Sequence, residues 1–143
     1  MIVLDANVLL YAHDADSPHH RQTRAWLEKA ASGRELLGLT WFTIAAFLRI
    51  STNGRLYPSP LSAGEAGSVI STLLRHPAFR LIEPGESFWD ILLELLEEAR
   101  VSGPLVTDAI LAAIALERGA TLASSDRDFR RFKGLRLIDP LQL

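Results

Sequence analysis

Four aspartates occupy positions from which a metal site made only of oxygen ligands could be built. Asp5 ends an apolar run at the N-terminus, and Asp108 stands at the start of a long helix-like run. Asp126 and Asp128 follow a third run that is typical of a strand. Crowded carboxylates repel one another unless a cation joins them, and Mg²⁺ or Mn²⁺ is the usual partner of such oxygen ligands. The four acids therefore predict a divalent metal site, which could activate water and stabilise charge on a phosphoryl group.

The elements that must position these acids alternate between strands and helices. Apolar residues at helical spacing separate short apolar runs, and serine, proline and glycine mark several helix ends. We expect strands over residues 2–5, 36–39, 80–82, 121–123 and 135–138. We expect helices over residues 6–12, 18–32, 41–51, 62–75, 86–100 and 106–118, and a short helix over 128–132.

Two of the helix starts carry specific capping signals. Ser17 resembles an N-cap with Pro18 at the first helical position, which is a favoured combination. Ser62 is followed three residues later by Glu65, which is the pattern of a capping box.

Strands separated by helices imply a parallel sheet that is covered on both faces. In such a sheet, functional groups gather at the carboxyl ends of strands and at the helix starts beside them. Distant parts of the chain can therefore bring their acids to one pocket. The sequence predicts a single domain over residues 1–143, an α/β fold built as a three-layer α/β/α sandwich with a mainly parallel central sheet.

Composition excludes several kinds of chemistry. The chain has 143 residues, is 48% hydrophobic and contains no cysteine, which rules out disulfides, thiolate zinc sites and cysteine nucleophiles. The apolar N-terminal run lacks a basic leader, and no run approaches the roughly 18 apolar residues of a membrane span. We therefore expect a soluble cytoplasmic protein with no membrane association.

The charge distribution leaves room for nucleic acid only at a local patch. The net charge of −2 gives no bulk attraction to a polyanion, whereas nucleic-acid-binding domains are often clearly basic. Basic residues cluster near the last acids, and this cluster could contact phosphates or simply be a solvated face: Arg127, Arg130, Arg131, Lys133 and Arg136.

Each acid also has a purely structural explanation. Asp5 and Asp126 could cap the helices that follow them, and Asp108 could favour a helix start through its negative charge. Three such acids at predicted strand ends and helix starts are harder to explain this way, particularly because polar residues flank them as candidate supporting groups: Asn7, Thr107 and Ser125. Neither a glycine-rich nucleotide loop nor the elbow of a serine hydrolase accompanies the acids.

The motifs together resemble the PIN domain, and more narrowly the VapC-type toxin ribonucleases of bacterial toxin–antitoxin pairs. The resemblance rests on three segments in order and runs nearly end to end: Ile-Val-Leu-Asp-Ala-Asn-Val-Leu-Leu-Tyr at residues 2–11, Val-Thr-Asp-Ala at 106–109 and Ser-Ser-Asp-Arg-Asp-Phe at 124–129.

The resemblance implies an endoribonuclease that depends on Mg²⁺ or Mn²⁺. The residues that match the family's metal ligands are Asp5, Asp108 and Asp126, with Asp128 nearby and Asn7 supporting the first acid. It also implies a homodimer and a small VapB-type antitoxin as partner. RNA phosphates are expected to contact five basic residues: Arg49, Arg127, Arg130, Arg131 and Lys133.

One position departs from the family pattern. The family commonly carries a glutamate in the helix after the second strand, and Ala46 stands there in this chain. A methyl group cannot bind a metal or orient water, so the loss puts a second metal ion in doubt. Asp128 could compensate, or Arg49 could contact phosphate instead.

Two other functions stay open at this point. One is a catalytically weakened PIN-like module that works by binding alone, which Ala46 favours. The other is a Mg²⁺-dependent phosphatase or phosphoacceptor domain, although Asn7 replaces the second acid of a nucleophilic Asp-x-Asp pattern. Apolar stripes over residues 41–50 and 88–96 favour a homodimer as well as core packing, and the tryptophans there, Trp41 and Trp89, could serve either role.

Overall fold

Five short parallel strands form one sheet in the computed structural model, which describes residues 1–143. The strands are β1 (Ile2–Leu4), β2 (Leu37–Leu39), β3 (Phe79–Leu81), β4 (Thr121–Ala123) and β5 (Arg136–Ile138). Their order across the sheet is β3-β2-β1-β4-β5, and every neighbouring pair is parallel. The chain moves outward from β1 to β3 and then returns to the other side of β1, so the order reverses between β1 and β4. Such a reversal is where open α/β sheets bind their ligands, at the carboxyl ends of the strands.

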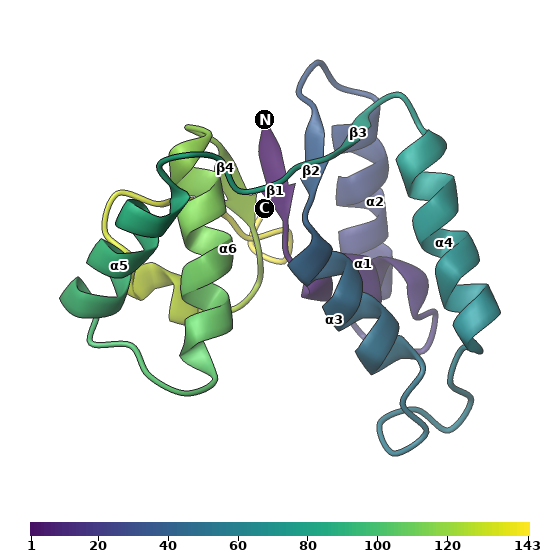
Figure 1. The fold of residues 1–143 in the computed structure, drawn as a ribbon. Helices are drawn as coiled ribbons and strands as arrows, with labels where there is room; N and C mark the ends of the chain where they lie inside the picture. Colours follow the sequence, from purple (N-terminus) through teal and green to yellow (C-terminus); the bar gives the residue numbers. More distant parts are fainter.

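Helices cover both faces of the sheet, which confirms the predicted α/β/α sandwich (Figure 1). One layer contains α1 (Ala6–His13), α2 (His20–Ala31), α3 (Trp41–Ser51) and α4 (Ala63–Arg75). The other contains α5 (Phe88–Glu98), α6 (Leu105–Glu117) and the short 3₁₀ helix η1 (Arg127–Arg131). None of these helices combines the length and the apolar character that a membrane crossing requires.

The central strand supplies both cores because side chains alternate across a strand. Ile2 and Leu4 pack with the α1–α4 layer, whereas Val3 packs with α5 and α6. α6 lies flat on the sheet because its inner surface is mostly alanine, and Ala109, Ala112 and Ala113 are completely buried. This close packing fixes the first turn of α6 beside the carboxyl ends of β1 and β4.

Most predicted element boundaries hold to within two residues. The capping box is confirmed: Ser62 Oγ accepts from the Glu65 N–H at 3.1 Å, and Glu65 Oε1 accepts from the Ser62 N–H at 3.0 Å. The prediction that Ser17 caps the N-terminus of α2 is wrong. Ser17 Oγ accepts from the His19 N–H in a turn, and α2 begins only at His20.

The third strand is shifted by one residue from the prediction and covers Phe79–Leu81. Phe79 is buried in the core of the α1–α4 layer, which fixes the start of the strand. Ile82 is buried against the opposite layer, and its N–H still donates to the Leu39 carbonyl just past the end of the strand.

Candidate active site

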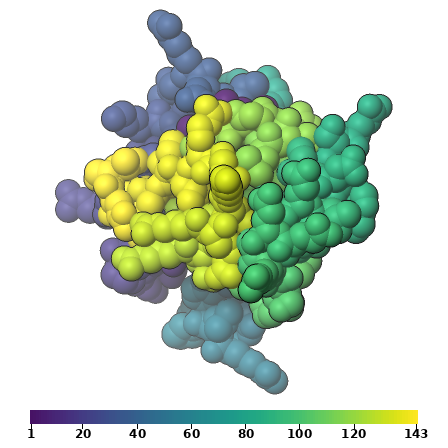
Figure 2. All heavy atoms as spheres, turned by 90° about the vertical axis from the view of Figure 1, so that its left-hand side faces the viewer, coloured from purple at the N-terminus to yellow at the C-terminus, as the bar shows by residue number.

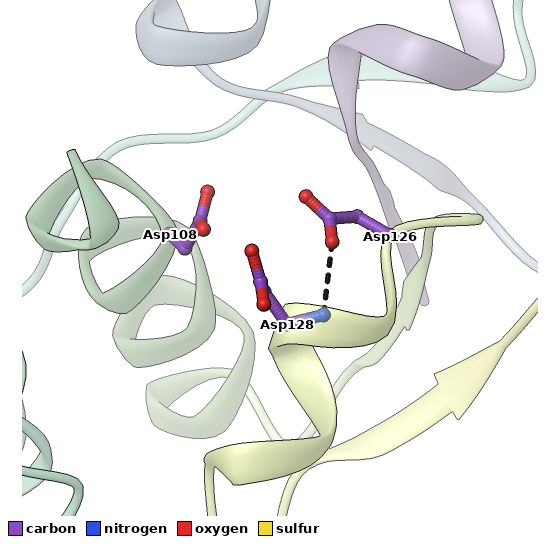
Figure 3. A group of neighbouring side chains, drawn as sticks. All are labelled: Asp108, Asp126 and Asp128. Carbon is purple, nitrogen blue, oxygen red and sulfur yellow. Dashed lines mark hydrogen bonds between the residues drawn. The ribbon is translucent and has the colours of Figure 1, made fainter.

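Three carboxylates converge at the carboxyl end of β4 and the first turn of α6. Asp108, Asp126 and Asp128 each place an oxygen within 4.8 Å of the others, and Figure 3 shows the three side chains pointing toward one another. Asp126 precedes η1 and Asp128 lies within it, so the turn after β4 holds both opposite α6. The sequence prediction that distant acids meet in one place is confirmed for this trio.

Asp5 borders the trio from the carboxyl end of β1 and belongs to a hydrogen-bonded network. Its Oδ1 accepts from the Ala6 N–H at 2.7 Å, and its Oδ2 accepts from the Ser124 hydroxyl at 2.7 Å. Burial raises the pKa of Asp5; the hydrogen bonds from Ser124 and Ala6 act in the opposite direction, and the nearby Asp126 charge adds to the rise. The carboxyl group is therefore fixed in position, and its burial makes the charged form less favourable than it is in water.

Ser124 connects the acids of two strands, and the sequence prediction had missed it. Its hydroxyl donates to Asp5, accepts from Asn7 Nδ2 at 3.1 Å and accepts from the Asp126 N–H at 3.0 Å. Ser125, which was predicted for this role, makes no side-chain hydrogen bond. Asn7, which was predicted to support Asp5, reaches that acid only through the Ser124 hydroxyl, so its supporting role stays a prediction. The signal that could have identified Ser124 is its place directly after β4, where its side chain returns toward β1.

Asp108 is the acid that the protein itself stabilises least. Its carboxyl group has no hydrogen-bond partner, and it does not cap α6, which begins at Leu105 after Pro104 and has no side-chain cap. Burial and then the charges of Asp126, Asp5 and Asp128 raise its pKa to about 6, against an opposing effect of Arg131. The capping explanation does not apply to Asp108, although its place in the first turn of α6 lets its negative charge favour the helix start. The capping explanation holds in part for Asp5 and Asp126, which do accept from the N–H groups of Ala6 and Asp128.

Ala46 lies beside the acids, as the family pattern predicted for this position. It lines a small cavity of about 40 Å³ together with Asp5 and Asp108. Thr107 borders the same cavity, but its side chain is exposed and forms no hydrogen bond. A carboxylate is thus missing from the side of the site that faces α3, and Asp128 supplies one from the opposite side.

The basic residues have different roles from one another. Arg127 and Arg130 line a pocket of about 370 Å³ that includes Asp126. Arg131 instead pairs with Asp128 at 3.2 Å and also donates to its carbonyl, so it partly neutralises the acid cluster. Arg136, at the outer strand β5, donates to the Gly119 carbonyl. Arg49 and Lys133 are exposed and have no ion pair.

The donor set fits a divalent cation. Three carboxylates lie within reach of one oxygen-liganded ion, one of them has no hydrogen bond, and Arg131 compensates their negative charge only in part. Hard divalent cations take several carboxylate oxygens as ligands at once. Fold and site thus define a class: an open parallel α/β sandwich with a carboxylate cluster that could hold a metal ion at the switch point of its sheet.

The chain belongs to the PIN domain family, whose profile matches residues 2–135. Ribonuclease VapC43 of Mycobacterium tuberculosis is 41% identical over 141 residues, which cover 99% of this chain and 96% of that protein. Ribonuclease VapC37 of the same species is 39% identical over 140 residues, covering 98% of this chain and 97% of the relative. The FitAcB crystal structure from Neisseria gonorrhoeae has the same fold, with a TM-score of 0.72 at 20% identity and complete coverage of both chains.

Proposed function

We propose that this chain is a divalent-metal-dependent endoribonuclease that hydrolyses RNA phosphodiester bonds and acts as the toxin of a type II toxin–antitoxin system. The observation that carries the proposal is the convergence of Asp108, Asp126 and Asp128 within 4.8 Å in a PIN-family chain. The names of the relatives, ribonucleases VapC43 and VapC37, support RNA as the substrate. An RNA substrate also favours the cytoplasm as the place of action.

Asp5 from the end of β1, Asp108 and Asp126 are the proposed metal ligands, and Asp128 from η1 completes the acidic wall. When bound, Mg²⁺ or Mn²⁺ would supply Lewis-acid stabilisation of the phosphate charge and a more acidic water. Ser124 keeps Asp5 in place and ties it to the Asp126 backbone. Arg131 holds the Asp128 carboxylate at the rim of the site.

Arg127 and Arg130 are the best-placed phosphate contacts because their pocket includes Asp126. Figure 2 shows the segment after β4 (yellow) at the molecular surface beside α5 (green). Replacing both arginines with alanine should weaken RNA binding and reduce the slope of log affinity against log salt by about 1.4, the value for two phosphate contacts on single strands. The same salt titration with Arg49 and Lys133 replaced by alanine tests these two exposed residues. If neither double variant changes the slope, none of the four residues contacts a phosphate.

A small VapB-type antitoxin is the proposed protein partner. A toxin–antitoxin complex from Klebsiella pneumoniae shares the fold, with a TM-score of 0.66 at 16% identity and full coverage of both chains. The uncompensated acids suit a basic segment of such a partner, which would compete with both metal and RNA. Affinity capture with a tagged chain followed by mass spectrometry would identify it, and recovery of the chain alone would count against a stable partner.

The deciding experiment is RNA cleavage by the purified chain in Mg²⁺, in Mn²⁺ and in EDTA, with Asp108→Asn as the inactive control. We expect cutting that requires metal and that the variant lacks, because the variant keeps the shape of the site and loses a ligand charge. The second candidate is the binding module that Ala46 favours. RNA binding without cleavage in either metal would replace the nuclease with that module.

A further inference from the structure

A second pocket lies where the ends of α1 and α3 meet the loop between α3 and α4. Its volume is about 130 Å³, and Leu10, Phe47 and Leu61 form its apolar walls. Five side chains that can form hydrogen bonds also line it: His13, Asp14, Ser51, Tyr57 and Ser59. We refer to this cavity, defined by these eight residues, as the α1–α3 pocket.

Ser51 is the group in the α1–α3 pocket that most clearly lacks a partner. The residue is 7% exposed, and its hydroxyl is buried without any hydrogen bond. Buried hydroxyl groups are nearly always paired, with protein atoms or with a bound molecule. The oxygen itself has almost no accessible surface, but Ser51 lines the cavity, so rotation of its side chain can turn the hydroxyl toward a group that enters the pocket.

The remaining polar groups define the ligand's chemistry. His13 Nδ1 lies 2.8 Å from the Leu9 carbonyl, which can only accept, so Nδ1 is the donor and Nε2 is left as the acceptor. Partial burial lowers the pKa of His13 and keeps the ring neutral. Asp14 uses one oxygen to accept from the Asp16 N–H at 3.1 Å, which leaves the other free. Burial and the nearby Asp14 raise the pKa of the Tyr57 phenol, so it keeps its proton. A matching ligand has an apolar body and donates hydrogen bonds from its edge.

The α1–α3 pocket lies on the same two helices as the acid site. α1 has Asp5 at its N-cap and His13 as its last residue, a length of about 12 Å at the rise of an α-helix. α3 contributes Ala46 to the acidic cavity and Ser51 to this pocket, and α1 packs against α3 along the way. A single strand that crosses the acids can therefore reach the pocket with a neighbouring nucleotide.

We propose that the α1–α3 pocket binds one unstacked nucleobase of the RNA substrate, a base with an exocyclic amino group rather than uracil. Proteins that read single-stranded RNA commonly insert an unstacked base beside aromatic side chains and bond its edge. Here the Tyr57 ring and the apolar wall of Leu10 and Leu61 enclose the base, and Asp14 and His13 accept from its amino edge. The inference rests on the proposed ribonuclease function and assigns part of its sequence selectivity to this pocket.

The test maps cleavage sites on a random-sequence single-stranded RNA pool in Mg²⁺ or Mn²⁺. Asp14→Asn replaces an acceptor with an amide that can donate, so preference for an amino base over uridine at the selected position should fall about 10-fold. Asp16→Asn is the matched control, because it makes the same charge change on a neighbouring exposed residue outside the pocket. Ser51→Ala should also reduce the preference, while its melting temperature stays unchanged because it removes a hydroxyl that has no partner.

The outcomes separate the two proposals. Cleavage by the wild-type chain with the same base preference in Asp14→Asn, Ser51→Ala and Asp16→Asn would overturn the pocket assignment and leave the nuclease intact. Absence of cleavage in both metals would instead reject the nuclease. In that event the same RNA pool is selected for binding to the chain in EDTA. The pocket assignment is overturned if the selected RNAs show no preference for amino bases, or if Asp14→Asn leaves that preference unchanged.

Discussion

At the scale of single residues, Asp108 shows how the fold prepares a site for a cation. Every other acid of the site has a hydrogen bond or an ion pair within the protein, whereas Asp108 has neither. Its pKa of about 6 results from burial and from three neighbouring acids. The free energy that the unpaired charge costs the metal-free protein is available to strengthen cation binding.

This cost predicts an unusual dependence of stability on pH. The folded protein binds the Asp108 proton more tightly than the unfolded chain, whose aspartates titrate near 3.8. In EDTA, stability should therefore be highest below about pH 4 for this group and should fall as the pH rises through 6. The full shift corresponds to about 3 kcal/mol, and screening of the partly exposed carboxyl reduces this to about 1 kcal/mol. A little under half of this effect is lost between pH 5 and 7, so melting temperatures in EDTA should drop by about 1.5 °C from this group over that interval.

Asp108→Asn serves as the control for that measurement. The variant should melt higher than the wild type at pH 7 in EDTA, show a weaker pH dependence and gain less from added Mg²⁺ or Mn²⁺. A variant that melts lower than the wild type under these conditions would indicate that the charge stabilises the fold, contrary to the role assigned here.

Ser124 is the residue whose loss should disturb the site without removing a charge. Ser124→Ala leaves Asp5, Asn7 and the Asp126 N–H without their shared partner, and the pKa of Asp5 should rise further because the hydroxyl holds it down. We expect about 10-fold weaker metal binding, as for other residues that orient ligands. Titration of the metal-induced rise in melting temperature measures this. Ser125→Ala is the matched control. If the two substitutions weaken metal binding equally, Ser124 does not position the acids.

At the scale of elements, the site depends on the turn after β4 and on the faces of α3 and α6. The convergence of the acids could be predicted from the sequence because carboxyl ends of parallel strands share one edge of a sheet. The sequence could not predict which side chain of residues 124–128 has which role, because a shift of one residue in a turn changes the side chain that points inward. The start of α2 was missed for a similar local reason: Ser17 binds its turn rather than the helix.

The α3 face offers a direct test of the missing glutamate. Ala46→Glu adds a carboxylate beside Asp5 and Asp108 in a small cavity, where it would be repelled by the other two acids. We expect lower stability in EDTA and a larger metal-induced rise in melting temperature than in the wild type. Ala45→Glu, one residue earlier and exposed on the same helix, is the control. Identical metal responses in the two variants would show that position 46 does not contribute to the metal site.

At the scale of the whole molecule, the helical apolar stripes were the least informative part of the sequence. They predicted amphipathic helices correctly but could not tell which apolar positions the fold covers. Trp41 is 54% exposed and Trp89 is 61% exposed, which rules out a core role for both. Sequence periodicity records only that a face is apolar, and the structure determines whether another part of the same chain covers it.

These tryptophans are two of five exposed apolar side chains on α3, β3 and α5, which we expect to form one apolar patch: Trp41, Phe42, Leu81, Trp89 and Leu93. The patch flanks the segment between β3 and α5, where Trp41 Nε1 donates to Glu83 Oε1 at 3.2 Å. Exposed apolar patches with aromatic side chains mark association surfaces, and a second copy of the chain is the simplest self-complementary partner. We therefore expect a homodimer built on this patch.

Trp89→Glu should separate the proposed dimer, because each copy would bury a charge against an apolar surface at the interface. Light scattering at micromolar concentration should give twice the chain mass for the wild type and the single mass for the variant. Leu56→Glu is a matched control: Leu56 is 59% exposed, close to the 61% of Trp89, but it lies in the loop between α3 and α4 away from the patch. A monomeric wild type would exclude the dimer at that concentration, and a dimeric Trp89→Glu would place its interface elsewhere. Cleavage measured on the separated variant then shows whether one acid cluster is sufficient, since Trp89 has no contact with the carboxylates.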